Sequence, residues 1–167
     1  MKFAPNTTTM NQPSNKRSSR PPFFVGTLWV EDEQEYPASE ITLSEAEYEI
    51  DFSGTDEQMR HQQRSRIGIV LNKTDVPGLY GFLLQYIDPS AQPVLCGRTT
   101  GTIWVEEEEY YEEAVISWME NGNCISLAGA DEEMIQQNKF RVRVEIPKSH
   151  VPALAQYLKQ LIGNEDL

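Results

Sequence analysis

The sequence predicts an α+β fold in which a ββββα unit occurs twice in tandem. The main observation is a repeat: "GTLWVEDEQEY" at 26–36 recurs as "GTIWVEEEEYY" at 101–111. A shift of 75 positions aligns 25–87 with 100–162 without a gap, and 23 of the 63 aligned positions are identical. Two further observations are the alternation of apolar residues in each copy and the helical apolar stripe that closes it. Because glycines, prolines and leucines repeat in register, an internal duplication is indicated.

The first element of each copy is a predicted strand, at 26–31 and at 101–106. Leu28 and Val30 point to one side of it, whereas Thr27 and Trp29 point to the other, as alternation along a strand requires. The acids that follow are expected to carry the strand end into water. We expect Trp29 and its equivalent, Trp104, to anchor the core or the sheet surface.

The middle of each copy predicts a hairpin, a short polar segment and a fourth strand. In the second copy, "AVISWM" and "CISLAGA" flank "ENGN", whose Asn121-Gly122 pair is typical of a two-residue turn. The polar "DEEMIQQNK" that follows predicts a turn or a short helix. The fourth strand has inward positions in both copies, namely Ile67, Ile69 and Leu71 in the first and Val142, Val144 and Ile146 in the second.

Each copy ends in a predicted helix with one buried stripe at a spacing of three and four residues. The stripe consists of Val76, Leu79, Leu83 and Ile87, repeated as Val151, Leu154, Leu158 and Ile162. Thr74 and Ser149 are candidate helix caps. A unit of roughly 65 residues buries little surface alone, so we expect both copies to share one core. The expected result is eight antiparallel strands with two helices packed around a pseudo-twofold axis.

The domain organisation follows from the repeat and from composition. We expect a disordered basic tail at 1–22, the first unit at 23–87, a linker at 88–97, the second unit at 98–162 and a short acidic tail at 163–167. The first 22 residues contribute a charge of +4 and the remainder −16, which together give the net charge of −12. No apolar segment predicts a secretory signal or a membrane span, and we expect a cytoplasmic protein.

A strongly acidic body favours basic partners, although high net charge also simply maintains solubility. The residues predicted to contact a partner are the acids of the repeated run: Glu31, Glu33, Glu106, Glu107, Glu108 and Glu109. Four of them, Glu31 with Glu33 and Glu106 with Glu108, could hold a divalent cation through oxygen ligands. A solvated strand end is the favoured interpretation, because charge runs usually face water.

No motif predicts catalysis. The two histidines, His61 and His150, do not belong to the repeated positions, and the two cysteines, Cys96 and Cys124, share no motif spacing. Neither a nucleotide-binding glycine loop nor a nucleophile motif is present. We therefore expect no catalytic, cofactor or metal site. The predicted function is a non-catalytic binding or regulatory protein that engages a basic protein.

The alternative is a single-stranded nucleic-acid binder. In the order of its elements, the duplicated ββββα unit resembles the whirly and PUR families, which lay bases against curved sheets. The resemblance implies contacts from strand residues expected to be exposed, and from the basic tail. The candidates are Arg17, Arg20, Arg66, Arg141, Arg143, Trp29 and Trp104, with Trp118 as a further aromatic. The acidic body argues against this alternative, because phosphate affinity depends on clustered lysine and arginine.

Overall fold

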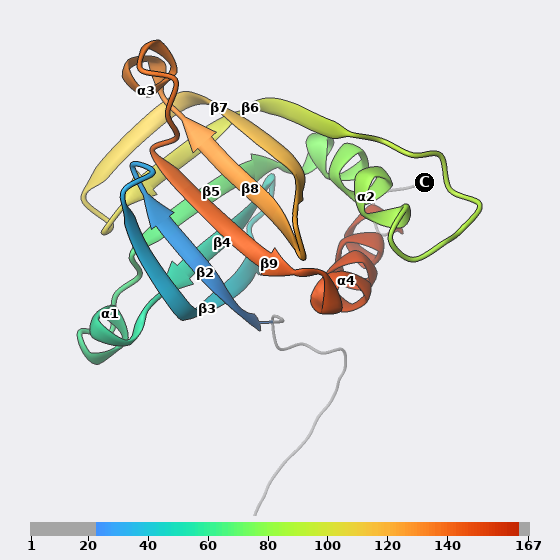
Figure 1. Ribbon diagram of the computed structural model, residues 1–167, viewed down its shortest axis with the longest axis horizontal. Helices are drawn as coiled ribbons and strands as arrows, with labels where there is room; N and C mark the ends of the chain where they lie inside the picture. The colour runs from blue at the N-terminus through green and yellow to red at the C-terminus, as the bar shows by residue number, and fades with distance from the viewer. Residues whose placement is uncertain (1–22, 164–167) are drawn as a thin grey trace, which may run out of the picture.

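The computed structural model describes residues 23–163. Their strands form one closed antiparallel barrel, in which each strand pairs with the next in the chain and the last pairs with the first (Figure 1). The strands are β2 (Phe23–Val30), β3 (Gln34–Glu45), β4 (Glu49–Thr55), β5 (Ile67–Asn72), β6 (Cys96–Val105), β7 (Glu109–Asn121), β8 (Cys124–Ala130) and β9 (Val142–Pro147). The expected eight antiparallel strands are thus present. The predicted basic tail at 1–22 lies outside the described residues, as do positions 164–167.

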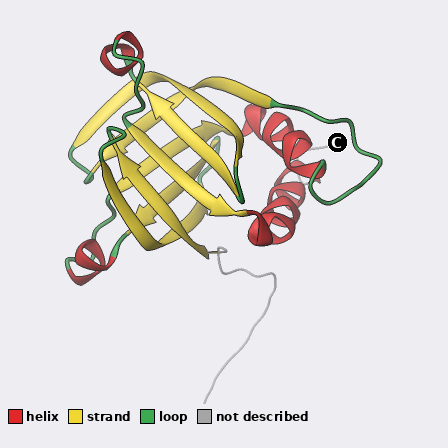
Figure 2. Ribbon diagram, viewed as in Figure 1, coloured by secondary structure: helices red, strands yellow, loops and turns green. Residues whose placement is uncertain are grey.

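The helices occupy two regions of the barrel. The longer helices, α2 (Val76–Leu84) and α4 (Val151–Gly163), contact each other at one end, which we call the helical end (Figure 2). Each follows a 3₁₀ turn, η2 (Lys73–Asp75) or η3 (Lys148–His150). The short helices α1 (Glu57–His61) and α3 (Glu132–Gln136) connect the third and fourth strand of each half, where a turn or short helix is predicted.

The two halves of the barrel, β2–β5 and β6–β9, meet along two seams. One seam runs from the pair Ile67–Val105 to the pair Val70–Thr102. The other runs from Thr27–Glu145 to Val30–Val142 and closes the barrel. Each seam joins an edge strand of one half to an edge strand of the other, so neither half forms a closed structure alone.

The barrel interior is filled by side chains. The predicted inward positions of β5 and β9 are all buried, as are Leu28 and Val30 on β2. Glycines make room for the larger groups: a Cβ added to Gly54 would lie 2.4 Å from Leu28, and one added to Gly129 would lie 2.4 Å from Ile103. Each missing side chain therefore accommodates a branched residue from the next strand but one in the barrel.

Two bulges bend the strands that follow the acidic turns. The β2–β3 register shifts between Gly26 and Leu28, where Ala38 has φ 55°. The β6–β7 register shifts between Gly101 and Ile103, where Glu113 has φ 61°. An extra residue in one strand increases local bend and twist, which allows the sheet to close.

The helices cover the helical end with the predicted stripes, since Val76, Leu79 and Leu83 are buried together with Val151, Leu154 and Leu158. The prediction that the last position of the first stripe is buried is wrong. Because α2 ends at Leu84, Ile87 is 43 % exposed, and Phe82 is buried instead. A side chain at the end of α2 also contacts the other half of the barrel. The Tyr86 hydroxyl, just beyond α2, donates to Glu120 on β7, and burial followed by this hydrogen bond raises the pKa of Tyr86 to about 12.

Three local predictions need correction. Thr74 and Ser149 are not helix caps, because they lie inside η2 and η3, and the N-cap of α2 is Asp75 without a side-chain bond. The β7–β8 turn consists of Gly122 and Asn123, one residue later than predicted, since Asn121 still pairs with Cys124. Gly122, with φ 63°, supplies the positive angle that the turn requires. The strand β6 begins at Cys96, inside the predicted linker, because it pairs with β7 as far as Met119.

Candidate functional site

The repeated acidic runs form two tight turns with unfavourable backbone angles. In the β2–β3 turn, Glu31 has φ 57° and Asp32 φ 60°; in the β6–β7 turn, Glu106 has φ 54° and Glu107 φ 59°. Two successive left-handed residues make a type I′ turn, for which Asn-Gly is the preferred sequence. A residue with a side chain costs about 1–2 kcal/mol in this conformation. Contacts outside the turn must therefore hold it.

These contacts come from the other half of the chain. The β2–β3 turn binds the segment before β9, and its three acids each take one partner there. The bonds are Arg141 Nη1 to Glu31 (2.7 Å), the Phe140 N–H to Asp32 (2.9 Å) and Lys139 Nζ to Glu33 (3.1 Å).

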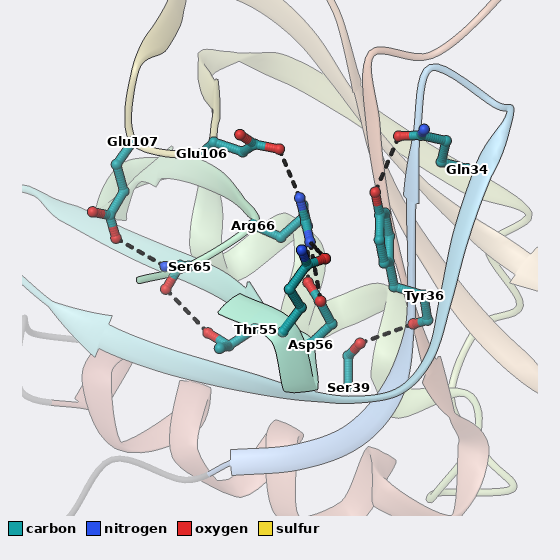
Figure 3. A network of polar contacts seen from close by, with 10 residues as sticks. Gln34, Tyr36, Ser39, Thr55, Asp56, Ser65, Arg66, Glu106 and Glu107 are labelled. Carbon is teal, nitrogen blue, oxygen red and sulfur yellow. Dashed lines mark hydrogen bonds and ion pairs between the residues drawn. The ribbon is translucent and has the colours of Figure 1, made fainter. Parts of the chain in front are cut away.

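The β6–β7 turn binds the segment before β5 in the equivalent way (Figure 3). The bonds are Arg66 Nη1 to Glu106 (2.7 Å), the Ser65 N–H to Glu107 (3.0 Å) and Arg64 Nη2 to Glu108 (3.2 Å). We call these two groups of contacts the clasps. Each clasp lies beside one seam, so the acids of the repeated run join the two halves through hydrogen bonds and ion pairs.

A buried arginine is the centre of each clasp. Arg66 donates two hydrogen bonds to Asp56, at 2.8 and 3.1 Å, and stacks over the Tyr36 ring at 4.4 Å. Arg141 donates to Asp131 at 2.8 and 3.0 Å. Burial alone would raise the pKa of Asp131, but the hydrogen bonds and charge of Arg141 outweigh it, and the pKa lies below its usual value. The pKa of Asp56 is lowered for the same reasons.

The structure shows that the expected exposure of Arg66 and Arg141 is wrong. Both are 6 % exposed, and Trp118, 4 % exposed, lies in the core. A strand pattern does not reveal this burial, because the covering carboxylates come from the other half. Arg17 and Arg20 lie outside the described residues.

The remaining alternative nucleic-acid contacts fall on two separate faces of the barrel. On the β2–β9 side, the Arg143 guanidinium lies 5.0 Å from the Trp29 ring, and the Trp29 indole donates to Glu145 at 3.2 Å. On the β5–β6 side, Trp104 lies against Gly68, where an added Cβ would be 1.9 Å from the ring. Trp29 and Trp104 are therefore sheet-surface residues that pack on their neighbouring strands.

Almost all lysines and arginines of the barrel form ion pairs with carboxylates of the barrel itself. Within residues 23–163, every lysine and arginine except Arg98 and Lys159 has a carboxylate oxygen within 4.0 Å. We call the carboxylates of this range without a cationic nitrogen at that distance the unpaired carboxylates. They are Glu35, Glu47, Glu49, Asp51, Asp75, Asp88, Glu107, Glu109, Glu112, Glu113 and Glu132.

One unpaired carboxylate, Asp51, belongs to a face that the sequence did not reveal. On the outer side of β4–β7, Tyr110 is 60 % exposed and its ring lies 6.2 Å from that of Trp104. Asp51 accepts a hydrogen bond from Ser53 and lies near the Trp104 side chain, and both lower the pKa of its carboxyl, yet burial is the largest effect and raises it. The available signal was Gly68, which stands where the second copy has Arg143.

Among residues 23–163, no group of three or more His, Cys, Asp or Glu side chains could hold a metal ion. Burial raises the pKa of the Cys124 thiol, which lowers its thiolate fraction at neutral pH.

In residues 23–163, no helix has the length and apolar character that crossing a membrane requires. No family model, curated protein or solved structure matches this chain.

Proposed function

We propose that the protein is a non-catalytic binding or regulatory protein that engages a basic protein through the unpaired carboxylates of the barrel. One observation carries the proposal: the barrel neutralises nearly all of its own lysines and arginines and leaves many carboxylates without a cation. Such a surface attracts opposite charge over long range and accelerates association with a basic partner.

The clasps change which acids would contact that partner. Glu31, Glu33, Glu106 and Glu108 already have cationic partners, and Glu107 accepts a backbone hydrogen bond. Of the six predicted partner-binding acids, Glu109 has neither an ion pair nor a bond to the other half, although Tyr111 donates to it at 3.1 Å. We therefore place the contact surface on Glu109 and the neighbouring Glu112 and Glu113, which follow the second clasp on β7.

We further propose that the barrel arose by tandem duplication of one unit. The supporting facts are the register of 75 residues and the matching element starts, such as Glu57 for α1 and Glu132 for α3. The clasps correspond in the same way, since Arg66–Glu106 in one is equivalent to Arg141–Glu31 in the other. A homodimer of the single unit would be closed by two identical clasps.

Affinity capture with the full chain, followed by binding measurements with the purified captured protein, tests the function. The expected partner is basic, and its association rate falls as salt is added. The variant E109Q/E112Q/E113Q should associate more slowly, whereas D75N/D88N, which removes two unpaired carboxylates near α2, should have a smaller effect. An acidic or neutral partner whose association is insensitive to salt would contradict the proposal.

A labelled single-stranded DNA provides the comparison with the alternative function. Arg66 and Arg141 are occupied by carboxylates, so we expect no binding at about 150 mM salt, where non-specific contacts with phosphate are weak. Micromolar or tighter binding at that salt concentration would favour the nucleic-acid binder instead.

A further inference from the structure

We propose that the outer face made by Asp51, Trp104 and Tyr110 binds an arginine or lysine side chain of the basic partner. We call this group of residues the aromatic–acid face. The inference rests on the proposed function and assigns the partner's anchor to a specific place on the barrel. Three observations on the described residues support it, and each is independent of the net charge.

The first observation is a recurring arrangement within the chain. Aromatic rings near carboxylates repeatedly receive a cation from the chain itself. The shortest such contact of each cation, with the distance from the cationic centre to the ring centroid, is Arg66 and Tyr36 (4.4 Å), Arg141 and Tyr111 (4.6 Å), Arg143 and Trp29 (5.0 Å), and Lys148 and Tyr86 (5.2 Å). The cation of each pair also contacts a carboxylate. Such contacts combine the attraction of the ring quadrupole with that of the charge.

The second observation is that the aromatic–acid face lacks this cation. Its equivalent in the other half of the barrel carries Arg143 opposite Trp29 across the β2–β9 pair. Opposite Trp104, across the β5–β6 pair, stands Gly68. Since Gly68 has no side chain, the Trp104 ring settles onto the backbone there, and the face keeps Tyr110 exposed. The ring of Tyr110 is thus available to a cation from outside.

The third observation is the state of Asp51. Its carboxylate is partly removed from water, and no lysine or arginine of residues 23–163 lies within 4.0 Å of it. Burial and then the charge of Glu49 disfavour its ionised form. A carboxylate in this position gains from an incoming cation, because the new charge replaces the lost hydration. The aromatic ring and the carboxylate thus favour the same kind of group.

The chain contains its own reporters for a test. The three tryptophans give three indole N–H signals in a nitrogen–proton correlation spectrum, and only Trp104 belongs to the aromatic–acid face. The full chain is titrated with the peptide Gly-Arg-Gly-Arg-Gly. We expect the Trp104 signal to shift in a saturable way. The Trp29 and Trp118 signals should stay in place, because Trp29 already stacks with Arg143 and Trp118 is in the core. The same peptide with citrulline for arginine keeps the shape without the charge and should cause no saturable shift.

Variants separate the ring from the carboxylate. Y110L should weaken peptide binding by about three- to tenfold, because it removes the ring but retains an apolar side chain. Y110F retains the ring and should bind as the wild type does. D51N should also weaken binding. Y48L alters another highly exposed tyrosine, 72 % accessible, and serves as the matched control with unchanged binding. The unshifted Trp29 and Trp118 signals show that each variant is folded.

Equal shifts of all three indoles, an equal response to the citrulline peptide, or unchanged binding by Y110L would each overturn the inference. The two proposals fail in different ways. If a basic partner is captured and binds Y110L as tightly as the wild type, the aromatic–acid face is not the anchor but the proposed function stands. If no basic partner binds and only the arginine peptide does, the proposed function fails and the face remains a cation site.

Discussion

Removal of Arg141 should destabilise the protein severely, because this residue joins the halves of the barrel. Its side chain is 7 % exposed, and its partners Asp131 and Glu31 are 12 % and 42 % exposed. The substitution Arg141→Met keeps much of the side-chain stem but leaves the Asp131 carboxylate without its cation. It also releases the Glu31 carboxylate, so that the left-handed Glu31 keeps only its backbone N–H bond to the carbonyl of residue 141, at 2.8 Å.

The expected magnitude follows from burial. Breaking one partner out of a buried ion pair costs about 3–5 kcal/mol. The exposed pair of Arg60 with Glu40, at 46 % and 42 % exposure, provides a matched comparison. Arg60→Met should cost at most about 1 kcal/mol, the upper value for surface pairs.

Urea unfolding at pH 7, followed by tryptophan fluorescence, measures both free energies of unfolding. A third variant, Arg141→Met/Asp131→Leu, should be more stable than Arg141→Met alone, because it removes the carboxylate that lost its partner. A loss below about 1 kcal/mol for Arg141→Met, or a double variant less stable than the single one, would refute this account of the clasp.

Further predictions concern acid, the helical end and two glycines. The pKa of Asp131 is lowered in the folded protein, so the stability that this carboxylate contributes is present above about pH 4 and is lost as the pH falls through the folded-state pKa. Asp131→Asn should therefore flatten the decline of the unfolding free energy in acid. Leu158→Ala leaves a cavity under α4 and should cost about 2–5 kcal/mol in urea unfolding, and a loss near zero would show that the stripe is not core. Gly68→Ala must displace the Trp104 ring and should lower the free energy of unfolding by about 1–3 kcal/mol. Gly81→Ala in α2 meets no atom within 4 Å and should raise the free energy of unfolding by about 0.5–1 kcal/mol. Equal melting temperatures for the two variants would contradict the packing described.

Local patterns in the sequence predict much of the fold. Alternation places Ile67 and Ile69 on an inward face, and the spacing of Leu79 and Leu83 predicts a buried helix stripe. The closure of the barrel is different, because it depends on pairing of β2 with β9. The partners Val30 and Val142 are distant in the chain, and no local pattern indicates that they meet.

The clasps show why the candidate site was only partly predictable. The acidic runs read as solvated strand ends, since a one-dimensional pattern cannot place Glu106 beside Arg66 from the other half. One signal was available: Asp56 and Arg66 recur as Asp131 and Arg141, with the same spacing and the same charges in both copies. A repeated acid–base pair in a strongly acidic chain indicates an internal partner.

Association rates between the full chain and its purified captured partner, measured at low and physiological salt, test directly whether the unpaired carboxylates guide the partner. We expect a rate that falls steeply with salt. We also expect E109Q/E112Q/E113Q to lower the rate at low salt and to reduce the salt dependence, while the melting temperature stays close to that of the wild type. An unchanged rate for this variant, with its fold intact, would show that the unpaired carboxylates beside the second clasp do not guide the partner.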